Sequence, residues 1–298
     1  MATSTLPTGP SSLTAFQDEK LQAYFTALAP EYARLTASST KHLLTEVLTS
    51  VPLGILGGEK VHDNACGPGT ATEALIDYCT ARNISPIHIT ATDVNEAMIS
   101  ALAVRAKEEG WTNVSSKVVD SHRLAGYQHD WFKFVFCNFS VFTFAKPLLA
   151  LIEIHRTLRH TGIAVFTCWK RFGVQEIMDD ARTAVKGDGP GEAIKGPGQE
   201  FFEEGYLAWL VEEAGWEKGK IKTLDRRIVI SDAAEVAAVI EFMAGDQTAF
   251  ARLDWSDEEK GRWPAAVKDA VDAAKARDGG IVMEAWVVLA RKWDALSA

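Results

Sequence analysis

The sequence lacks several features that would each point to a particular class of protein. Basic residues are not in surplus, because 31 Lys and Arg face 40 Asp and Glu, for a formal net charge of −9. A surface that binds nucleic acid nonspecifically must be basic to meet the phosphates, so this balance argues against such a partner. A run of about 18 apolar residues is also missing, so we expect no membrane span.

Cysteine is scarce and widely spaced. The four cysteines are Cys66, Cys79, Cys137 and Cys168, and they form no C-x-x-C pair. This spacing suits neither a zinc site nor a disulfide framework, so we expect reduced, mainly structural thiols and no bound metal. The first residues have no basic start followed by an apolar run. We therefore predict no secretory signal and a cytoplasmic protein.

The composition is that of an ordinary globular protein, with 47% hydrophobic and 24% charged residues in a chain of 298. Residues 1–12 are rich in Ser, Thr, Pro and Gly, which predicts a flexible tail. We expect residues 13–298 to form a single domain that buries a full hydrophobic core. A small-molecule substrate fits an acidic domain of this kind better than a polyanion does.

One stretch organises the rest of the chain: K-V-H-D-N-A-C-G-P-G-T-A-T-E-A-L, residues 60–75. It predicts a short strand that ends at Asp63, a tight turn with glycines at 67 and 69, and a helix from Thr70. Glycine permits a positive φ and a close approach of a ligand to the backbone. Thr70 and Glu73 have the spacing of a capping box. A strand, glycine turn and helix form the nucleotide-binding corner of a doubly wound sheet, although glycines that only make a turn look the same.

The third glycine of the dinucleotide fingerprint is missing, since Thr72 stands in its place. Acids follow two later strands instead: Asp93 ends the second predicted strand and Asp120 follows the third. An acid at the end of the second strand can accept two hydrogen bonds from a ribose diol. Alternatively it caps the next helix, a role that Asn95 can fill as well. A second acid after a third strand does not belong to the NAD fingerprint.

Together, these acids and glycines resemble the motifs of class I S-adenosylmethionine-dependent methyltransferases. Four further features are similar to the fungal members that tailor secondary metabolites: Y-x-x-x-T-x-x-x-T from Tyr32 to Thr40, D-N-A-C-G at 63–67, E-G-W at 109–111, and Trp169 after the fifth strand. The gliotoxin-type thiol methyltransferases look most similar. The resemblance covers nearly the whole chain, from about residue 24 to residue 292.

The resemblance implies an α/β fold with a seven-stranded Rossmann-like sheet in the strand order 3-2-1-4-5-7-6. Helical elements would flank it at both ends: an N-terminal cap over residues 13–50 and lid insertions at 170–202 and 232–279. The segment from 187 to 198 holds five glycines and two prolines in a dozen residues. Such a composition predicts a loop that could belong to a lid.

The resemblance also implies S-adenosylmethionine as cofactor, S-adenosylhomocysteine as its product, and no metal. The implied cofactor-binding residues are the glycine turn, the strand-end acids and their neighbours: Asp63, Asn64, Ala65, Gly67, Gly69, Asp93, Val94, Met98, Asp120, Ser121, Asn138 and Phe139. In this scheme Asp120 holds the adenine amino group, and Met98 can lie under the adenine ring.

Candidate residues of the substrate pocket are Tyr24, Tyr32, Thr40, Phe142, Phe144 and Trp169. For Tyr32 and Thr40 a helix face and a cap explain the residues equally well, and for Phe142 and Phe144 plain packing is the alternative. The sequence identifies no catalytic base. We interpret His122 as a histidine of an exposed loop.

We therefore expect an enzyme, a monomer or homodimer, that methylates a small-molecule natural product. Oxygen methylation of a hydroxyl is the first expectation, because hydroxyl acceptors are the more widespread. Sulfur methylation of a thiol is the alternative, since a thiolate needs little help in losing its proton. Two rivals remain: a protein of this fold that binds the cofactor without catalysis, and an NAD-dependent dehydrogenase.

Overall fold

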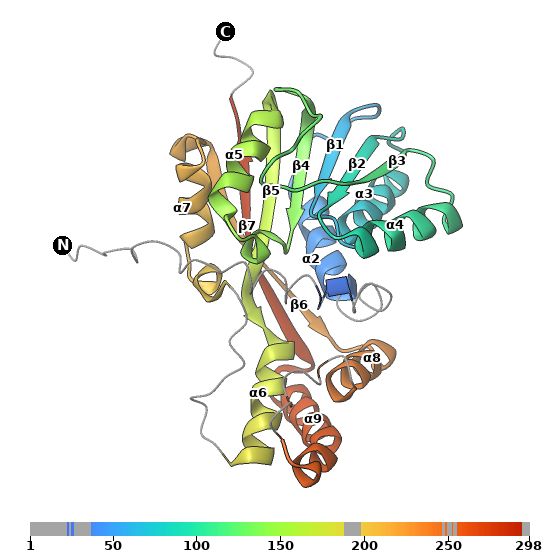
Figure 1. The fold of residues 1–298 in the computed structure, drawn as a ribbon, viewed down its shortest axis with the longest axis vertical. Coiled ribbons are helices and arrows are strands. Elements are labelled where there is room, and N and C mark those ends of the chain that lie inside the picture. Colours follow the sequence, from blue (N-terminus) through green and yellow to red (C-terminus); the bar gives the residue numbers. More distant parts are fainter. Residues whose placement is uncertain are drawn as a thin grey trace, which may run out of the picture.

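The computed structural model describes residues 23, 25–26, 37–187, 198–245, 248, 252 and 255–293. The strands are β1 (Lys60–Asn64), β2 (His88–Asp93), β3 (Val114–Val118), β4 (Phe132–Asn138), β5 (Leu158–Phe172), β6 (Ile221–Ile230) and β7 (Ile281–Arg291). They form one sheet in the order β3-β2-β1-β4-β5-β7-β6, which confirms the predicted order (Figure 1). The first five strands are parallel, and β7 runs antiparallel between β5 and β6.

Helices cover both faces of this sheet (Figure 1). They are α2 (Ala37–Ser50), α3 (Thr70–Ala81), α4 (Glu96–Glu108), α5 (Pro147–Thr157), α6 (Gly173–Lys186), α7 (Tyr206–Glu213), α8 (Ala233–Ala244) and α9 (Asp257–Asp278), with short 3-10 turns η1 (Val141–Thr143), η3 (Gln199–Phe202) and η4 (Lys218–Lys220). One core cluster joins α2 and α3 to the sheet, and a second joins α5 and α7 to its other face.

The central strand β4 shows why the chain folds this way. Phe134 and Phe136 point into the cluster with α2 and α3, whereas Val135 and Cys137 point into the cluster with α5 and α7. All four are fully buried. A continuous apolar run is what a parallel strand needs when helices cover both of its faces. The prediction that Phe134 and Phe136 belong to the core is confirmed.

The strand β5 is much longer than a typical strand and extends beyond the parallel part of the sheet. Past Trp169, its residues Arg171 and Phe172 still pair with β7, opposite Glu284 and Met283. The helix α6 begins at the next residue, Gly173, where an added Cβ would lie 2.3 Å from the Val282 carbonyl oxygen. Glycine therefore allows α6 to start directly against β7.

A group of three helices, α6, α8 and α9, packs beside this extension of β5, β6 and β7 (Figure 1). Their apolar side chains, among them Trp263 and Val267, belong to the same cluster as α2 and α3. These helices correspond to the expected lid insertions. None of their described residues lines the cavity presented below, so a lid role stays a prediction. The predicted tail at 1–12 and most of the glycine-rich segment lie outside the described residues.

Candidate functional site

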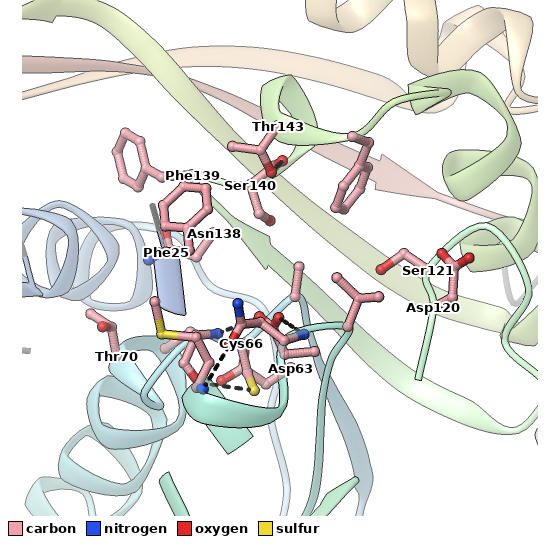
Figure 2. A pocket seen from close by; sticks show the side chains of 18 of the residues that line it. Phe25, Asp63, Cys66, Thr70, Asp120, Ser121, Asn138, Phe139, Ser140 and Thr143 are labelled. Atoms are coloured by element: carbon pink, nitrogen blue, oxygen red, sulfur yellow. Dashed lines mark hydrogen bonds between the residues drawn. The ribbon is translucent and has the colours of Figure 1, made fainter. Parts of the chain in front are cut away.

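A cavity opens at the carboxyl ends of β1, β2 and β4, where ligands bind in open α/β sheets. Figure 2 shows Phe139, Ser140 and Thr143 on one side of it, Asp63 and Cys66 on the opposite side, and Asp120 with Ser121 at one end. Twelve of the residues predicted from the sequence line it: Thr40, Asp63, Ala65, Gly67, Asp93, Val94, Met98, Asp120, Ser121, Asn138, Phe139 and Phe144.

Four predicted residues lie close by but do not line the cavity. Asn64 is fully buried behind it and accepts a hydrogen bond from the Ser121 hydroxyl at 3.0 Å. Trp169 stands behind Phe139, with ring centroids 4.1 Å apart. Phe142 packs on Phe201 and on the backbone at Gly198, and Gly69 packs on Leu102. Tyr24 and Tyr32 lie outside the described residues.

Asp63 ends β1 with a fully buried carboxylate. Its Oδ2 accepts hydrogen bonds from the Thr72 N–H at 2.9 Å and the Thr72 hydroxyl at 2.7 Å. Its Oδ1 has no partner within the described structure. Burial raises the pKa of Asp63 to about 6, and the two bonds from Thr72 oppose this rise. A buried oxygen without a partner in a cavity wall is suited to a cationic donor from a ligand.

Asp93 ties the glycine turn to the end of β2. Its Oδ2 accepts from the Gly67 N–H at 2.9 Å, and its Oδ1 accepts from the Asn95 N–H at 2.8 Å. Burial raises the pKa of Asp93, although these N–H donors oppose the rise. The helix cap is Asn95 itself, whose Oδ1 accepts from the N–H groups of Ala97 and Met98. Asp93 therefore does not cap α4, and its carboxylate lines the cavity at the end of β2.

The two glycines of the turn have different structural roles. Both have a positive φ, 53° at Gly67 and 91° at Gly69. An added Cβ at Gly67 would meet nothing within 4 Å, and Gly67 lines the cavity, so that space is open to a ligand. At Gly69 a Cβ would lie 2.4 Å from Leu102 Cδ1 of α4. Gly69 thus serves the packing of the turn against α4.

The predicted capping box at Thr70 and Glu73 is wrong. Gly69, which has no side chain, is the cap of α3, and the first-turn N–H of Thr72 donates to Asp63 instead. Glu73 instead pairs with Lys41 of α2 at 2.9 Å and with Arg105 of α4 at 2.5 Å. The two cations outcompete the backbone for this carboxylate, because a hydrogen bond between charged groups is the stronger. Thr70 and Ala71 of this first turn line the cavity.

Asp120 is held by His122, to which the sequence analysis gave no role in the site. His122 Nδ1 lies 2.7 Å from Asp120 Oδ1, and His122 Nε2 accepts the Lys146 N–H at 3.1 Å. Because Nε2 accepts, the ring proton sits on Nδ1 and is donated to Asp120. His122 thereby links the loop after β3 to the segment before α5, and it lines the cavity. His122 lies in a loop, as interpreted from the sequence, but its side chain is only one quarter exposed.

The chain leaves β4 through a left-handed turn. Phe139 has a φ of 53°, which costs a bulky residue about 1–2 kcal/mol. Its N–H donates to Thr167 Oγ1 of β5 at 2.8 Å. This turn aims Asn138 and Phe139 into the cavity, together with Ser140 (Figure 2).

Several lining residues were missed by sequence reasoning. They are Phe25, Cys66, Thr70, Ala71, Asn95, His122, Ser140, Thr143 and Ala145. Phe25 is the neighbour of the predicted Tyr24, and Thr26 accepts a hydrogen bond from the Asn95 side chain at 2.9 Å. This contact brings residues 25 and 26 against the start of α4, from a segment with no motif of its own. Cys66 is buried, and burial raises the pKa of its thiol well above the usual range, so it lines the cavity as a neutral group.

The donor set fits S-adenosylmethionine. Asp63 offers an unpartnered buried oxygen, Asp93 offers lone pairs at the end of β2, and Gly67 leaves the space of a missing Cβ. No cluster of His, Cys, Asp and Glu that could hold a metal occurs among the described residues. Within the same residues, no helix is long and apolar enough to cross a membrane.

Comparisons with known proteins agree with this geometry. The sequence model of a family described as "Methyltransferase domain" matches residues 62–166. The methyltransferase tpcH of Aspergillus fumigatus is 31% identical over 125 residues, which are 42% of this chain and 44% of that protein. The match thus spans less than half the length of that relative. The acetylaranotin bis-thiomethyltransferase of Aspergillus terreus is 21% identical over 254 residues, 81% of this chain and 82% of that protein.

Solved structures support the fold alone. A methyltransferase in complex with the Trm112 activator of Haloferax volcanii has a TM-score of 0.51 and 15% identity, over 90% of this chain and 97% of that one. At this identity only the architecture is comparable. Residues 62–166 thus match a methyltransferase domain, the sheet has the strand order that the resemblance implied, and the chain is similar to methyltransferases of Aspergillus species.

Proposed function

We propose that the cavity binds S-adenosylmethionine and that the protein transfers its methyl group to a hydroxyl of a small-molecule natural product. The observation that carries this proposal is the division of the cavity. Its acids, Asp63, Asp93 and Asp120, come from the ends of β1 and β2 and from the loop after β3. Its aromatic wall, Phe139 and Phe144, follows β4. A polar cofactor half therefore adjoins an apolar half for the acceptor.

Each acid has a role that its surroundings support. Asp93 would accept hydrogen bonds from the hydroxyls of a ribose, because its carboxylate lines the cavity and has more acceptor sites than its backbone donors Gly67, Asn95 and Val94 use. Asp63 Oδ1 would accept from the ammonium of the methionine end, which would also hold this buried carboxylate in its charged form. Asp120, oriented by His122, keeps Oδ2 for the adenine amino group.

When bound, the cofactor supplies a methyl group on a sulfonium, which an acceptor atom displaces in line. The protein then has to align the acceptor, exclude water and tolerate the cation. Phe25, Phe139 and Phe144 provide the apolar surface for exclusion of water, and aromatic faces are favourable for a cation. Alignment falls to the wall formed by Thr40, Asn138 and Thr143.

Sulfur methylation is the second candidate, and two observations favour it. The Aspergillus terreus relative is a bis-thiomethyltransferase by name. In addition, the cavity-lining residues that follow β4 (Asn138, Phe139, Ser140, Thr143 and Phe144) include no basic side chain, and His122 beside Phe144 already has Asp120 and the Lys146 N–H as partners of its two ring nitrogens. A thiol with its lower pKa needs less proton removal than an alcohol does.

Binding and transfer need separate experiments. Isothermal titration calorimetry with S-adenosylhomocysteine tests the cofactor, and the same titration with NAD is the control for a dehydrogenase. Heat from NAD and none from S-adenosylhomocysteine would overturn the proposal. Incubation with cofactor carrying a labelled methyl, against phenolic, enolic and thiol metabolites, then tests transfer. Labelled ethers support oxygen methylation and labelled thioethers replace it with sulfur. Binding without any labelled product would leave a noncatalytic cofactor-binding protein.

A further inference from the structure

The turn after β4 is strained, buried and part of the cavity wall. Phe139 holds a left-handed backbone, which L side chains other than Asn and Asp seldom adopt. Strained residues persist only where the surrounding structure holds them, and they concentrate at functional sites. Phe139 is 6% exposed, and both it and Asn138 line the cavity. The residues that hold this turn in place therefore determine the shape of the cavity wall that Asn138 and Phe139 form.

One hydroxyl holds both residues of the turn. Thr167 Oγ1 accepts the N–H of Phe139 at 2.8 Å and donates its own proton to Asn138 Oδ1 at 2.9 Å. Thr167 lies opposite Asn138 in the parallel pairing of β4 and β5, so the two side chains share one face of the sheet. Thr167 is 1% exposed and does not line the cavity.

Through Asn138, the same hydroxyl is linked to α2, which also contributes to the cavity wall. Once Thr167 fixes Asn138 Oδ1, the amide of Asn138 presents its Nδ2 to the carbonyl oxygen of Thr40, at 3.4 Å. Thr40 belongs to the first turn of α2 and also lines the cavity. The Phe139 ring meanwhile rests on Trp169, the residue two positions after Thr167 on the same strand. Thr167 and Trp169 of β5 thus support the two residues of the turn from behind, Thr167 by hydrogen bonds and Trp169 by ring packing on Phe139.

We infer that Thr167 is a positioning residue whose hydroxyl holds Asn138 and Phe139 in the turn that forms the wall of the cavity after β4. This inference rests on the proposed function. Thr167 touches neither cofactor nor acceptor, so it acts through Asn138 and Phe139. Without the hydroxyl, the buried N–H of Phe139 would lack an acceptor, and the left-handed turn would lose what compensates its strain.

The test compares Thr167→Val, which keeps the shape and removes the hydroxyl, with Thr167→Ser, which keeps the hydroxyl. Thr157→Val is the matched control, because Thr157 is also fully buried but its hydroxyl bonds only within α5. Thr167→Ala serves if the valine variant does not fold. Hydrogen exchange followed by mass spectrometry reports on peptides covering 138–144, and calorimetry reports the affinity for S-adenosylhomocysteine.

We expect Thr167→Val to speed exchange in the 138–144 peptides and to weaken S-adenosylhomocysteine binding roughly 10-fold, the loss of one buried hydrogen bond. Thr167→Ser should restore both, and Thr157→Val should change neither. Unchanged exchange and affinity in Thr167→Val would overturn the inference. If the unaltered protein binds no S-adenosylhomocysteine, the proposed function fails instead, and exchange alone decides whether Thr167 holds the turn.

Discussion

Burial shifts the pKa values of two neighbouring residues of β1, His62 and Asp63, in opposite directions. His62 and Asp63 are both fully buried. Burial lowers the pKa of His62 to about 3 and raises that of Asp63 to about 6. His62 stacks on Phe132 with its Nε2 at Thr92, away from the cavity that Asp63 lines. Both shifts disfavour the charged form, so burial favours the neutral form of each side chain.

The signs of the two effects on stability are opposite. Unfolded His62 takes up a proton below about pH 6.5, whereas the folded residue resists it down to about pH 3. Its contribution to stability is therefore lost as the pH falls through this window. Folded Asp63 keeps its proton up to about pH 6, so its contribution is lost as the pH rises from about 4 to 6.

A substitution at His62 separates the two. We expect His62→Gln to reduce the loss of stability between about pH 7.5 and pH 5.5 by about 1.4 kcal/mol relative to the unaltered protein. Urea unfolding at both pH values measures it, and the contribution of Asp63 cancels in the comparison. Equal losses in the two proteins would mean that His62 titrates normally in the fold.

The carboxylate of Asp93 is expected to govern cofactor affinity. Asp93→Asn replaces one charged oxygen that accepts from Gly67 or Asn95 with an amide donor. We expect binding of S-adenosylhomocysteine to weaken by about 10- to 100-fold, as for the loss of a hydrogen bond to a charged group. Calorimetry measures the change. Asp272→Asn on the exposed face of α9 is the control, and an equal effect there would contradict a specific role for Asp93.

At the scale of one element, the two glycines of the turn before α3 have different roles: Gly67 leaves space in the cavity, and Gly69 allows the turn to pack against α4. Gly67→Ala would place a methyl group in the cavity, and Gly69→Ala would drive one into Leu102 of α4. We expect Gly67→Ala to weaken S-adenosylhomocysteine binding by roughly 10-fold or more at a stability cost of about 1 kcal/mol. For Gly69→Ala we expect a stability loss of about 1–3 kcal/mol and little change in affinity.

Thermal unfolding and calorimetry on the two alanine variants distinguish these outcomes. Each variant is titrated below its unfolding temperature, so that affinity refers to folded protein. In a double-mutant cycle, Gly69→Ala should cost less stability in the Leu102→Ala background than in the unaltered protein, because Leu102→Ala removes the atom that the new Cβ would meet. The interpretation would be wrong if both glycine variants lost affinity alike.

At the scale of the whole molecule, Arg171 joins the sheet to the group of α6, α8 and α9. Its guanidinium contacts Glu176 of α6 at 2.7 Å and Asp278 of α9 at 3.1 Å. These carboxylates hold the pKa of Arg171 above its ordinary value, with the hydrogen bond from Glu176 as the largest cause. Arg171 follows the irregularity in the β5–β7 pairing, where the sheet leaves the parallel region.

Removal of this junction should loosen the helical group locally. We expect Arg171→Met to lower the free energy of unfolding by about 1 kcal/mol at low salt, with a smaller loss at high salt, since the ion pairs are partly exposed. Hydrogen exchange should quicken in α6 and α9 and remain unchanged in α3. Lys268→Met, which breaks one exposed pair on α9, is the control. Faster exchange throughout the protein would argue against a local junction.

Much of the fold was predictable because its signals are local. Apolar runs that end in Asp63 and Asp93, with helical patterns between them, predict parallel strands, and the strand order then followed from the resemblance. The capping box failed because Glu73 has two cationic partners, Lys41 and Arg105, from helices distant in sequence. A local pattern cannot show a competitor that only packing brings close.

The candidate site divides in the same way. The acids were predictable because each follows a strand directly, and the carboxyl ends of parallel strands meet at one edge of the sheet. Three other residues of the site, Phe25, His122 and Thr167, could not be predicted, because each depends on a contact with another segment of the chain. Thr26 beside Phe25 bonds to Asn95, His122 bonds to Lys146, and Thr167 bonds to Phe139. Trp169, predicted as a pocket wall, stands one layer behind Phe139.

The sequence by itself determined the sheet and the acids that line its carboxyl edge, since apolar pattern, turn glycines and strand-end carboxylates act over a few residues. The tertiary structure alone decided which glycine faces the cavity, which hydroxyl holds the turn after β4, and where Glu73 finds its partners. These depend on distances between segments far apart in the chain. Such distances follow from how side chains fill a shared core, which no short stretch of sequence encodes.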